Sequence, residues 1–131
     1  MLNVLTPLSA ETEELLTQVI GCCIDVHRVL GPGLLESICS RAVCIELDAA
    51  GISYEREKQI EVVYRGQFLC HQRLDIVVEN QIVLEIKCVE RLNPVHDAQL
   101  LNYLRLSKLR VGLLVNFNVA VLKDGLRRRV L

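Results

Sequence analysis

Three charged side chains near the middle of the chain have the types and spacing needed for hydrolytic chemistry. Glu85 and Lys87 interrupt the apolar stretch VLEIKCVE, and Asp75 interrupts the earlier stretch RLDIVVE. Two carboxylates on adjacent strands make a hard oxygen site suited to Mg²⁺ or Mn²⁺. An ammonium group beside them can orient or help deprotonate a water molecule and counter the charge that grows on a scissile phosphate. The trio therefore suits phosphodiester hydrolysis, although the same residue types also form cross-strand ion pairs on solvated faces.

The pairing of two strands decides whether Asp75 faces Glu85. In an antiparallel hairpin the numbers of opposed residues have a constant sum, so this facing requires Val78 to pair with Ile82 across a loop of residues 79–81. A shorter, two-residue loop would turn Asp75 to the other face of the sheet from Glu85. The sequence ENQ is compatible with both loops, and only the longer one permits the metal site.

A polar stripe is expected on the helix that follows. Asn93 and Pro94 mark its start, and His96, Gln99 and Tyr103 fall at intervals of three and four on one face. The opposite side carries Leu100, Leu101 and Leu104. The stripe could hold a water molecule or a phosphate oxygen in the same cleft as the charged trio, and a helix with a half-wet face explains it as well.

Two helices are expected before any strand. Ser9 can cap a helix that runs to about Leu30, and GPG at residues 31–33 breaks it. A second helix is expected from about Leu34 until AAG ends it near Gly51. Its apolar face is predicted to hold Leu35, Ile38, Ala42, Ile45 and Leu47.

The strands follow from a change of period to two. Residues 59–64, 67–78 and 82–88 predict an antiparallel meander with a turn at Arg65 and Gly66, and simple alternation places Asp75 on the opposite face from its two apolar neighbours. After the polar-striped helix, which should end near Ser107, two more strands are expected. The first is VGLLVNF, which is nearly all apolar and is therefore expected to lie centrally in the sheet. The second is VAVLKDG. Three arginines, Arg127, Arg128 and Arg129, read as a solvated tail rather than a phosphate-binding arm.

Composition sets the broad class. The 131 residues fit one domain, residues 1–131, and 51% apolar with 24% charged residues excludes disorder. The net charge of -1 hides an asymmetry, with 5 Lys and Arg against 10 Asp and Glu in residues 1–66, and 10 against 6 in residues 67–131. The basic second half gives weak support for a nucleic-acid partner. The absence of a signal-like start or a membrane-spanning run leads us to expect a cytoplasmic protein with no membrane partner.

The six cysteines show no paired spacing near a histidine, so they are expected to be reduced core residues. A thiol-redox or zinc protein is the reading that this count alone would favour, and rapid alkylation of two low-pKa thiols would be its signature.

Beyond these separate signals, the series Asp75, then Glu85-Ile86-Lys87, then Gln99 with Tyr103 resembles the D…ExK…QxxxY series of the PD-(D/E)XK nuclease superfamily, with its last element typical of the RecB-like branch. The stretches LGPGLLESIC, LEIKCVERLNPVHDAQLLNYLRL and VGLLVNF together resemble the small bacterial GxxExxY proteins of that superfamily. The resemblance runs from about Ile24 to the C-terminus.

The resemblance implies an α/β, restriction-endonuclease-like fold, a mixed sheet of about five strands flanked by helices. It also implies a metal site for Mg²⁺ or Mn²⁺ made by Asp75, Glu85, the backbone carbonyl of Ile86 and Glu36, with Lys87 as the catalytic amine. The other pocket residues that it implies are His96, Gln99 and Tyr103. One position departs from the motif, because the final Tyr of GxxExxY is Cys39 here.

Some RecB-like nucleases carry an iron–sulfur cluster bound by one early and three late cysteines. No cysteine follows Cys88 in this chain, so no cluster is expected.

The function expected from the residues and the resemblance is metal-dependent cleavage of DNA or RNA. The alternative is a catalytically inactive module of the same fold that binds nucleic acid or a protein partner. A domain of this size offers little surface beyond the cleft for gripping a substrate, so a homodimer or a larger complex is also expected.

Overall fold

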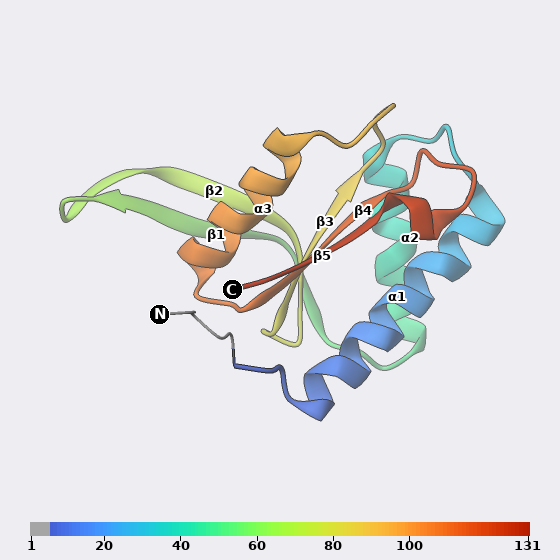
Figure 1. Cartoon of the computed structure of the whole chain (residues 1–131), viewed down its shortest axis with the longest axis horizontal. Coiled ribbons are helices and arrows are strands. Elements are labelled where there is room, and N and C mark those ends of the chain that lie inside the picture. Colours follow the sequence, from blue (N-terminus) through green and yellow to red (C-terminus); the bar gives the residue numbers. More distant parts are fainter. Residues whose placement is uncertain (1–5) are drawn as a thin grey trace.

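The computed structural model describes residues 6–131, which form three α-helices, one short 3₁₀ helix and a five-stranded mixed sheet (Figure 1). The elements, in chain order, are α1 (Ala10–Leu30), α2 (Glu36–Ala49), β1 (Tyr54–Tyr64), β2 (Gln67–Val78), β3 (Ile82–Lys87), α3 (Pro94–Ser107), β4 (Val111–Asn116), η1 (Leu122–Gly125) and β5 (Leu126–Val130). The strand order is β1-β2-β3-β4-β5, antiparallel throughout except for the β3–β4 pair. The predicted order of two helices, a meander, a helix and two further strands is confirmed.

The two N-terminal helices cover one face of the sheet. The Ser9 side chain accepts a hydrogen bond from the Thr12 backbone N–H (3.1 Å) and so caps α1 as expected. Gly31, at φ 65°, ends α1 in a conformation that favours glycine. The second helix begins at Glu36, about two residues later than predicted.

The predicted apolar face of α2 is wrong in part. Leu35, Ile38 and Ile45 are exposed, and the buried residues of the helix are Cys39, Ser40, Val43, Cys44 and Leu47. The helix packs against α1 on one side and against the sheet on the other. Three of the five buried residues, Cys39, Ser40 and Cys44, have small side chains, which allow α2 to approach its neighbours closely.

The β1–β2 hairpin is a long arm that extends away from the rest of the sheet (Figure 1). Its turn is the expected one, with Arg65 at φ 51° and Gly66 at φ 75° between the paired residues Tyr64 and Gln67. The first strand begins at Tyr54, about five residues before the predicted start, because it continues to pair with β2 down to Val78.

The β2–β3 hairpin has the longer of the two possible loops. Val78 pairs with Ile82, and the loop residues Glu79 and Asn80 have positive φ angles of 51° and 53°. The register that places Asp75 opposite Glu85 is therefore confirmed.

The nearly all-apolar strand β4 lies inside the sheet, between β3 and the edge strand β5, and all six of its residues are buried; the middle strand itself is β3. Strand β4 runs parallel to β3, and α3 makes the crossover and covers the sheet face opposite α1 and α2. A Cβ on Gly112 would lie 2.7 Å from a Leu100 side-chain carbon, so the glycine lets α3 approach the strand closely.

The last strand lies elsewhere than predicted. Residues 119–125 do not form a strand; Leu122–Gly125 form η1, and the arginines expected in a solvated tail lie in the edge strand β5, antiparallel to β4. The chain passes close to the end of β4 before β5 begins: a Cβ on Gly125 would lie 2.2 Å from the carbonyl oxygen of Asn116. Glycine therefore allows this close approach, after which the chain pairs with β4.

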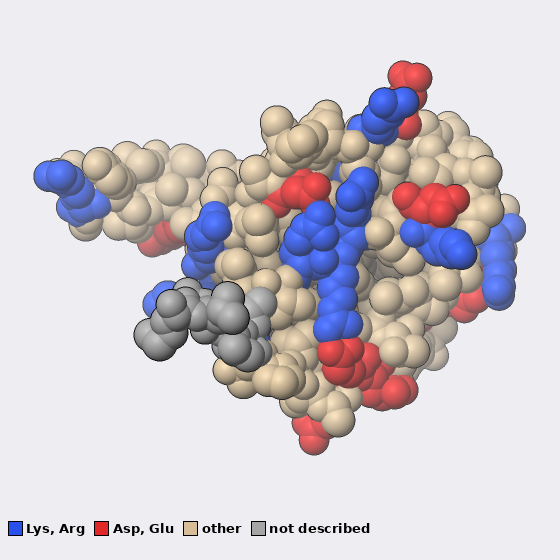
Figure 2. Space-filling view, viewed as in Figure 1, with Lys and Arg blue, Asp and Glu red and all other residues tan. Residues whose placement is uncertain are grey.

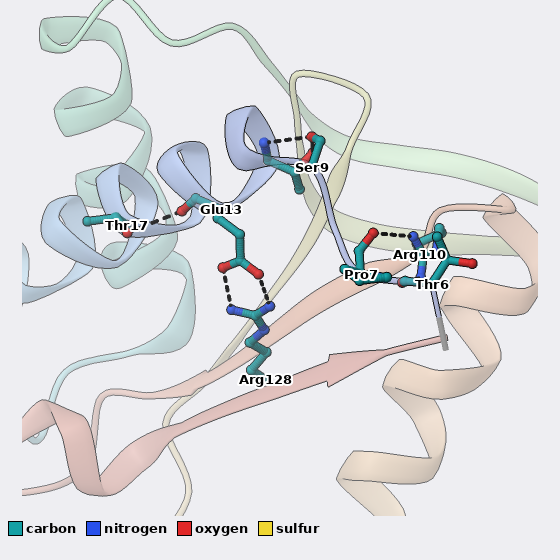
Figure 3. A network of polar contacts seen from close by, with 8 residues as sticks. Thr6, Pro7, Ser9, Glu13, Thr17, Arg110 and Arg128 are labelled. Atoms are coloured by element: carbon teal, nitrogen blue, oxygen red, sulfur yellow. Dashed lines mark hydrogen bonds and ion pairs between the residues drawn. The ribbon is translucent and has the colours of Figure 1, made fainter. Parts of the chain in front are cut away.

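Two of the three arginines of β5 pair with acidic residues of two helices. Arg128 holds the carboxylate of Glu13 with two hydrogen bonds of 2.8 and 2.5 Å (Figure 3), and Arg129 lies 2.8 Å from Asp97 of α3. Lys and Arg side chains form a band over the β5 region, with acidic side chains beside it (Figure 2). The neighbouring Arg110 donates to the backbone carbonyls of Thr6, Pro7 and Leu131. These arginines connect the edge of the sheet to the helices and to the N-terminal segment.

Within residues 6–131, no helix has the length and apolar character needed to span a lipid bilayer.

Candidate active site

The site lies where β2 and β3 separate. Their ladder ends at the pair Ile76 and Leu84, and the next two opposed residues are Asp75 and Glu85. The Asp75 backbone N–H donates to Glu85 Oε1 (3.2 Å), and the Ile86 backbone N–H donates to Asp75 Oδ2 (2.9 Å). Each carboxylate thus occupies the place of a lost backbone hydrogen bond, and the two side chains converge in the gap between the strands.

The strand geometry at Asp75 is irregular, and simple alternation is wrong there. Leu74 packs with α3, whereas Ile76 packs with α1 and α2, so these two neighbours do not share a face. On the adjacent strand, Glu57 has φ 56° and interrupts the β1–β2 ladder opposite Asp75. The resulting twist lets β2 leave β3 and opens the gap that the two carboxylates occupy.

Glu85 is the most buried charged group of the site, with 3% of its surface exposed. Burial raises the pKa of its carboxyl to about 8, and the negative charge of Asp75 adds to the rise. The charge of Lys87 acts in the opposite direction. A cation between the two carboxylates would relieve their repulsion and compensate the buried charge, so the donor set fits a hard divalent ion.

The amine of the site is held by the helix above it. The ammonium of Lys87, the last residue of β3, donates to Gln99 Oε1 of α3 (3.2 Å). One turn further along α3, Tyr103 is buried, and burial followed by the charges of Glu85 and Asp75 raises its pKa. The tyrosine hydroxyl therefore stays protonated and able to donate. Of the predicted polar stripe, Gln99 thus contacts Lys87, and Tyr103 lies near enough to the carboxylate pair for their charges to affect its pKa.

A cavity of about 210 Å³ lies on the α2 side and is lined in part by Glu36, Arg73 and Asp75. Burial and the charge of Asp75 raise the pKa of Glu36, and the charges of Lys87, Arg73 and His96 lower it. Glu36 thus belongs to the same electrostatic neighbourhood, whereas Gln99 and Tyr103 line a second, larger cavity on the α3 side.

Arg73 is a residue that the sequence reasoning missed. It lies in β2 two residues before Asp75, its side chain is 63% exposed, and its guanidinium lies 3.8 Å from Glu57. It lines the smaller cavity with Glu36 and Asp75, and its charge acts to lower the pKa of both Glu36 and Tyr103. The signal in the sequence that could have identified it is its position two residues before Asp75, in the stretch RLD.

His96 and Asn116 have positioning roles. The His96 Nδ1 accepts a hydrogen bond from the Asn93 backbone N–H (3.1 Å), and Asn93 in turn caps the helix, so the predicted pocket histidine closes a capping box at the start of α3. The buried Asn116 side chain bonds both the N–H (3.1 Å) and the carbonyl (2.9 Å) of Val89. It thereby fixes the segment that follows Lys87.

The cysteines are free thiols, and the prediction of core positions holds for most of them. Cys70, on the hairpin arm, is exposed and is the exception. Cys39, at the position of the motif tyrosine, is buried with its sulfur 3.8 Å from that of Cys88, and burial raises the pKa of both thiols, to about 12 for Cys88. Thiols of this kind are unreactive, which argues against the thiol-redox reading.

Within residues 6–131, no three His, Cys, Asp or Glu side chains are placed together as a metal-binding group. Asp75 and Glu85 therefore form a pair, and Glu36 approaches it without completing a cluster of three. The zinc reading finds no support in this part of the chain.

Comparison with known proteins gives one match. A family model of the PD-(D/E)XK nuclease superfamily matches residues 13–129, a span that includes every candidate site residue. Searches of curated proteins and of solved structures gave no match. Nucleases of this superfamily generally use divalent metal ions. The match covers most of the chain, and the mixed sheet with helices on both faces is the restriction-endonuclease-like α/β fold, so the chain belongs to the PD-(D/E)XK nuclease superfamily.

Proposed function

We propose that this protein is a metal-dependent nuclease that hydrolyses phosphodiester bonds of DNA or RNA. The observation that carries the proposal is the convergence of Asp75 and Glu85 in the gap between β2 and β3, with Lys87 one side chain further along the same strand. In a chain of this superfamily, that arrangement supports metal-assisted hydrolysis of a phosphodiester.

The residues that would hold the ion are Asp75, Glu85 and the backbone carbonyl of Ile86, with Glu36 as a further acidic member. When bound, Mg²⁺ or Mn²⁺ supplies Lewis-acid chemistry that polarises the phosphate. The fit rests on two buried or half-buried carboxylates whose mutual repulsion a cation removes. Hard oxygen donors of this kind select Mg²⁺ or Mn²⁺ over softer metals.

The chain's own groups supply the remaining chemistry. Lys87, kept in place by Gln99, presents its ammonium where it can orient the attacking water and counter the charge on the phosphate. Tyr103, with its raised pKa, can donate a hydrogen bond to a phosphate oxygen. Arg73, exposed beside Asp75, is placed to bind the substrate backbone.

Within the superfamily we place the chain in the RecB-like QxxxY branch, near the GxxExxY proteins. Gln99 and Tyr103 supply the first motif, and Gly33 and Glu36 supply the second up to its last position. At that last position the buried Cys39 packs against Cys88, so the motif's own tyrosine has no counterpart in this chain.

The test is cleavage of labelled single- and double-stranded DNA and RNA with Mg²⁺ or Mn²⁺. We expect metal-dependent cutting that EDTA abolishes and that Lys87→Ala reduces by orders of magnitude. Binding without cutting of any substrate, with Lys87→Ala equal to the parent, would instead identify a catalytically inactive binding module. Cutting that survives both EDTA and Lys87→Ala would contradict the mechanism.

A further inference from the structure

A groove of about 580 Å³ lies between α3 and the β1–β2 hairpin. One wall comes from the hairpin, through Val62 and Gln72, and the other comes from α3, through Ala98, Asn102 and Arg105. The volume falls in the range of about 300–1,000 Å³ that is usual for ligand sites.

The groove is continuous with the candidate active site. Gln99 and Tyr103 line it, and the same Gln99 accepts a hydrogen bond from Lys87. Tyr103 lies close enough to Glu85 and Asp75 for their charges to raise its pKa. A ligand in the groove would therefore lie next to the bond that the carboxylates and the lysine act on.

The lining has the chemistry of a nucleobase site. Apolar side chains such as Val62 can contact the flat face of a base, while the side-chain amides of Gln72 and Asn102, on opposite walls, can bond its polar edges. Arg105 donates to Asn102 Oδ1 (3.0 Å), which steadies that amide and adds a positive charge for a phosphate. No carboxylate lines the groove, so nothing in its lining repels a nucleic-acid backbone.

We infer that this groove binds an unpaired nucleobase of the substrate strand beside the scissile phosphate, so that single-stranded nucleic acid, or a single-stranded segment, is the preferred substrate. The inference rests on the proposed nuclease function. In a duplex the bases are stacked and paired, and each would have to be flipped out before it could enter the groove.

The test measures binding to the full chain in metal-free buffer, by fluorescence anisotropy. The probes are a labelled single strand, the same sequence as a duplex, and a strand of the same length whose bases are missing. We expect the parent to bind the single strand about tenfold tighter than either of the others, as one base held in the groove would give. The parent's cleavage of the single strand and the duplex with Mg²⁺ is measured in parallel.

Two variants and one control locate the base. Ala98→Trp fills the groove from an exposed position on α3, and Asn102→Ala removes one amide; both should remove most of the preference for the base-containing strand. Ala49→Trp, the same substitution at the exposed end of α2, should leave it unchanged. Circular dichroism verifies that the variants are folded.

The outcomes separate this inference from the proposed function. Base-dependent binding that Ala98→Trp abolishes supports the groove, whether or not the protein cuts. Cleavage of duplex and single strand at equal rates, with equal affinity for the base-free strand, would overturn the groove and leave the nuclease intact. A loss of dimer in Ala98→Trp, seen by gel filtration, with unchanged oligonucleotide affinity would show a protein interface and overturn it as well.

Discussion

Asp75 and Glu85 each bind backbone of the opposite strand: the Asp75 N–H donates to Glu85 Oε1, and Asp75 Oδ2 accepts from Ile86, the residue after Glu85. The two carboxylates therefore stand at the end of a strand pair that would otherwise continue. Their positions are set by the backbone of both strands, so the pair is preorganised before any ligand binds. Preorganisation of this kind is what a site for charged chemistry requires.

Separate substitutions should divide ion binding from cleavage. Lys87→Ala leaves both carboxylates in place, so it should bind Mn²⁺ about as well as the parent and still lose cleavage by orders of magnitude. Asp75→Ala should lose both Mn²⁺ binding and cleavage, because it removes one of the two carboxylates and the acceptor for the Ile86 N–H. Calorimetric titration with Mn²⁺ and oligonucleotide cleavage provide the two readouts. Equal loss of Mn²⁺ binding in both variants would contradict the separate roles.

The metal-free protein should lose stability as pH rises. The pKa of Glu85 is about 8 in the folded protein against 4.5 for an ordinary glutamate, so between these values the folded state holds a proton that the unfolded chain has released. The free energy of unfolding that this group contributes is therefore complete below about 4.5 and is lost as pH rises through about 8.

Urea denaturation in EDTA across this pH range measures the effect. Glu85→Gln carries a neutral side chain of the same shape and should flatten the pH dependence, while Glu90→Gln, at an exposed position, should follow the parent. Identical curves for the parent and Glu85→Gln would show that Glu85 is ionised throughout.

Arg73 should contribute to substrate binding rather than to ion binding. Arg73→Gln should weaken oligonucleotide binding several-fold and reduce the slope of log affinity against log salt by about one, as the loss of one phosphate contact would. Arg128→Gln is the matched control, because Arg128 is occupied by Glu13. Anisotropy titrations at several salt concentrations compare the two, and equal slopes for both variants would place Arg73 outside the substrate path.

Gly125 should be far less tolerant than another glycine of the same chain. In Gly125→Ala the new Cβ would lie 2.2 Å from the Asn116 carbonyl oxygen, and this clash is hard to relieve because the obstructing atom belongs to backbone. We expect a loss of about 2 kcal/mol in the free energy of unfolding. Gly21→Ala, inside α1 with nothing within 4 Å of the new atom, should gain about 0.5–1 kcal/mol. Urea denaturation at one pH compares them, and equal stability would refute the contact.

The facing of Asp75 and Glu85 could be predicted from the sequence because it depends only on the length of the loop between β2 and β3. Once ENQ forms a three-residue loop, the pairing of Val78 with Ile82 fixes the partner of every later residue in β3, including Glu85. The capping signals at Ser9 and Asn93 fixed two helix starts in the same local way.

The parts that failed depend on contacts between distant segments. Gly125 lies against the Asn116 carbonyl, and no alternation within residues 119–125 reveals this close approach. Arg128 and Arg129 pair with Glu13 and Asp97, which are distant in sequence, so the stretch that composition assigns to a tail is a strand. Arg127 and Arg128 nevertheless remain exposed, as a solvated stretch would be. The departure from alternation at Asp75 likewise follows from Glu57 on the neighbouring strand.

A crystal soaked in Mn²⁺ shows whether Asp75 and Glu85 hold one divalent ion. We expect an anomalous difference peak about 2.1 Å from a carboxylate oxygen of each residue, and no such peak in crystals of Asp75→Asn treated in the same way. A peak elsewhere on the molecule, or none between these two side chains at a Mn²⁺ concentration that supports cleavage, would contradict the proposed metal site.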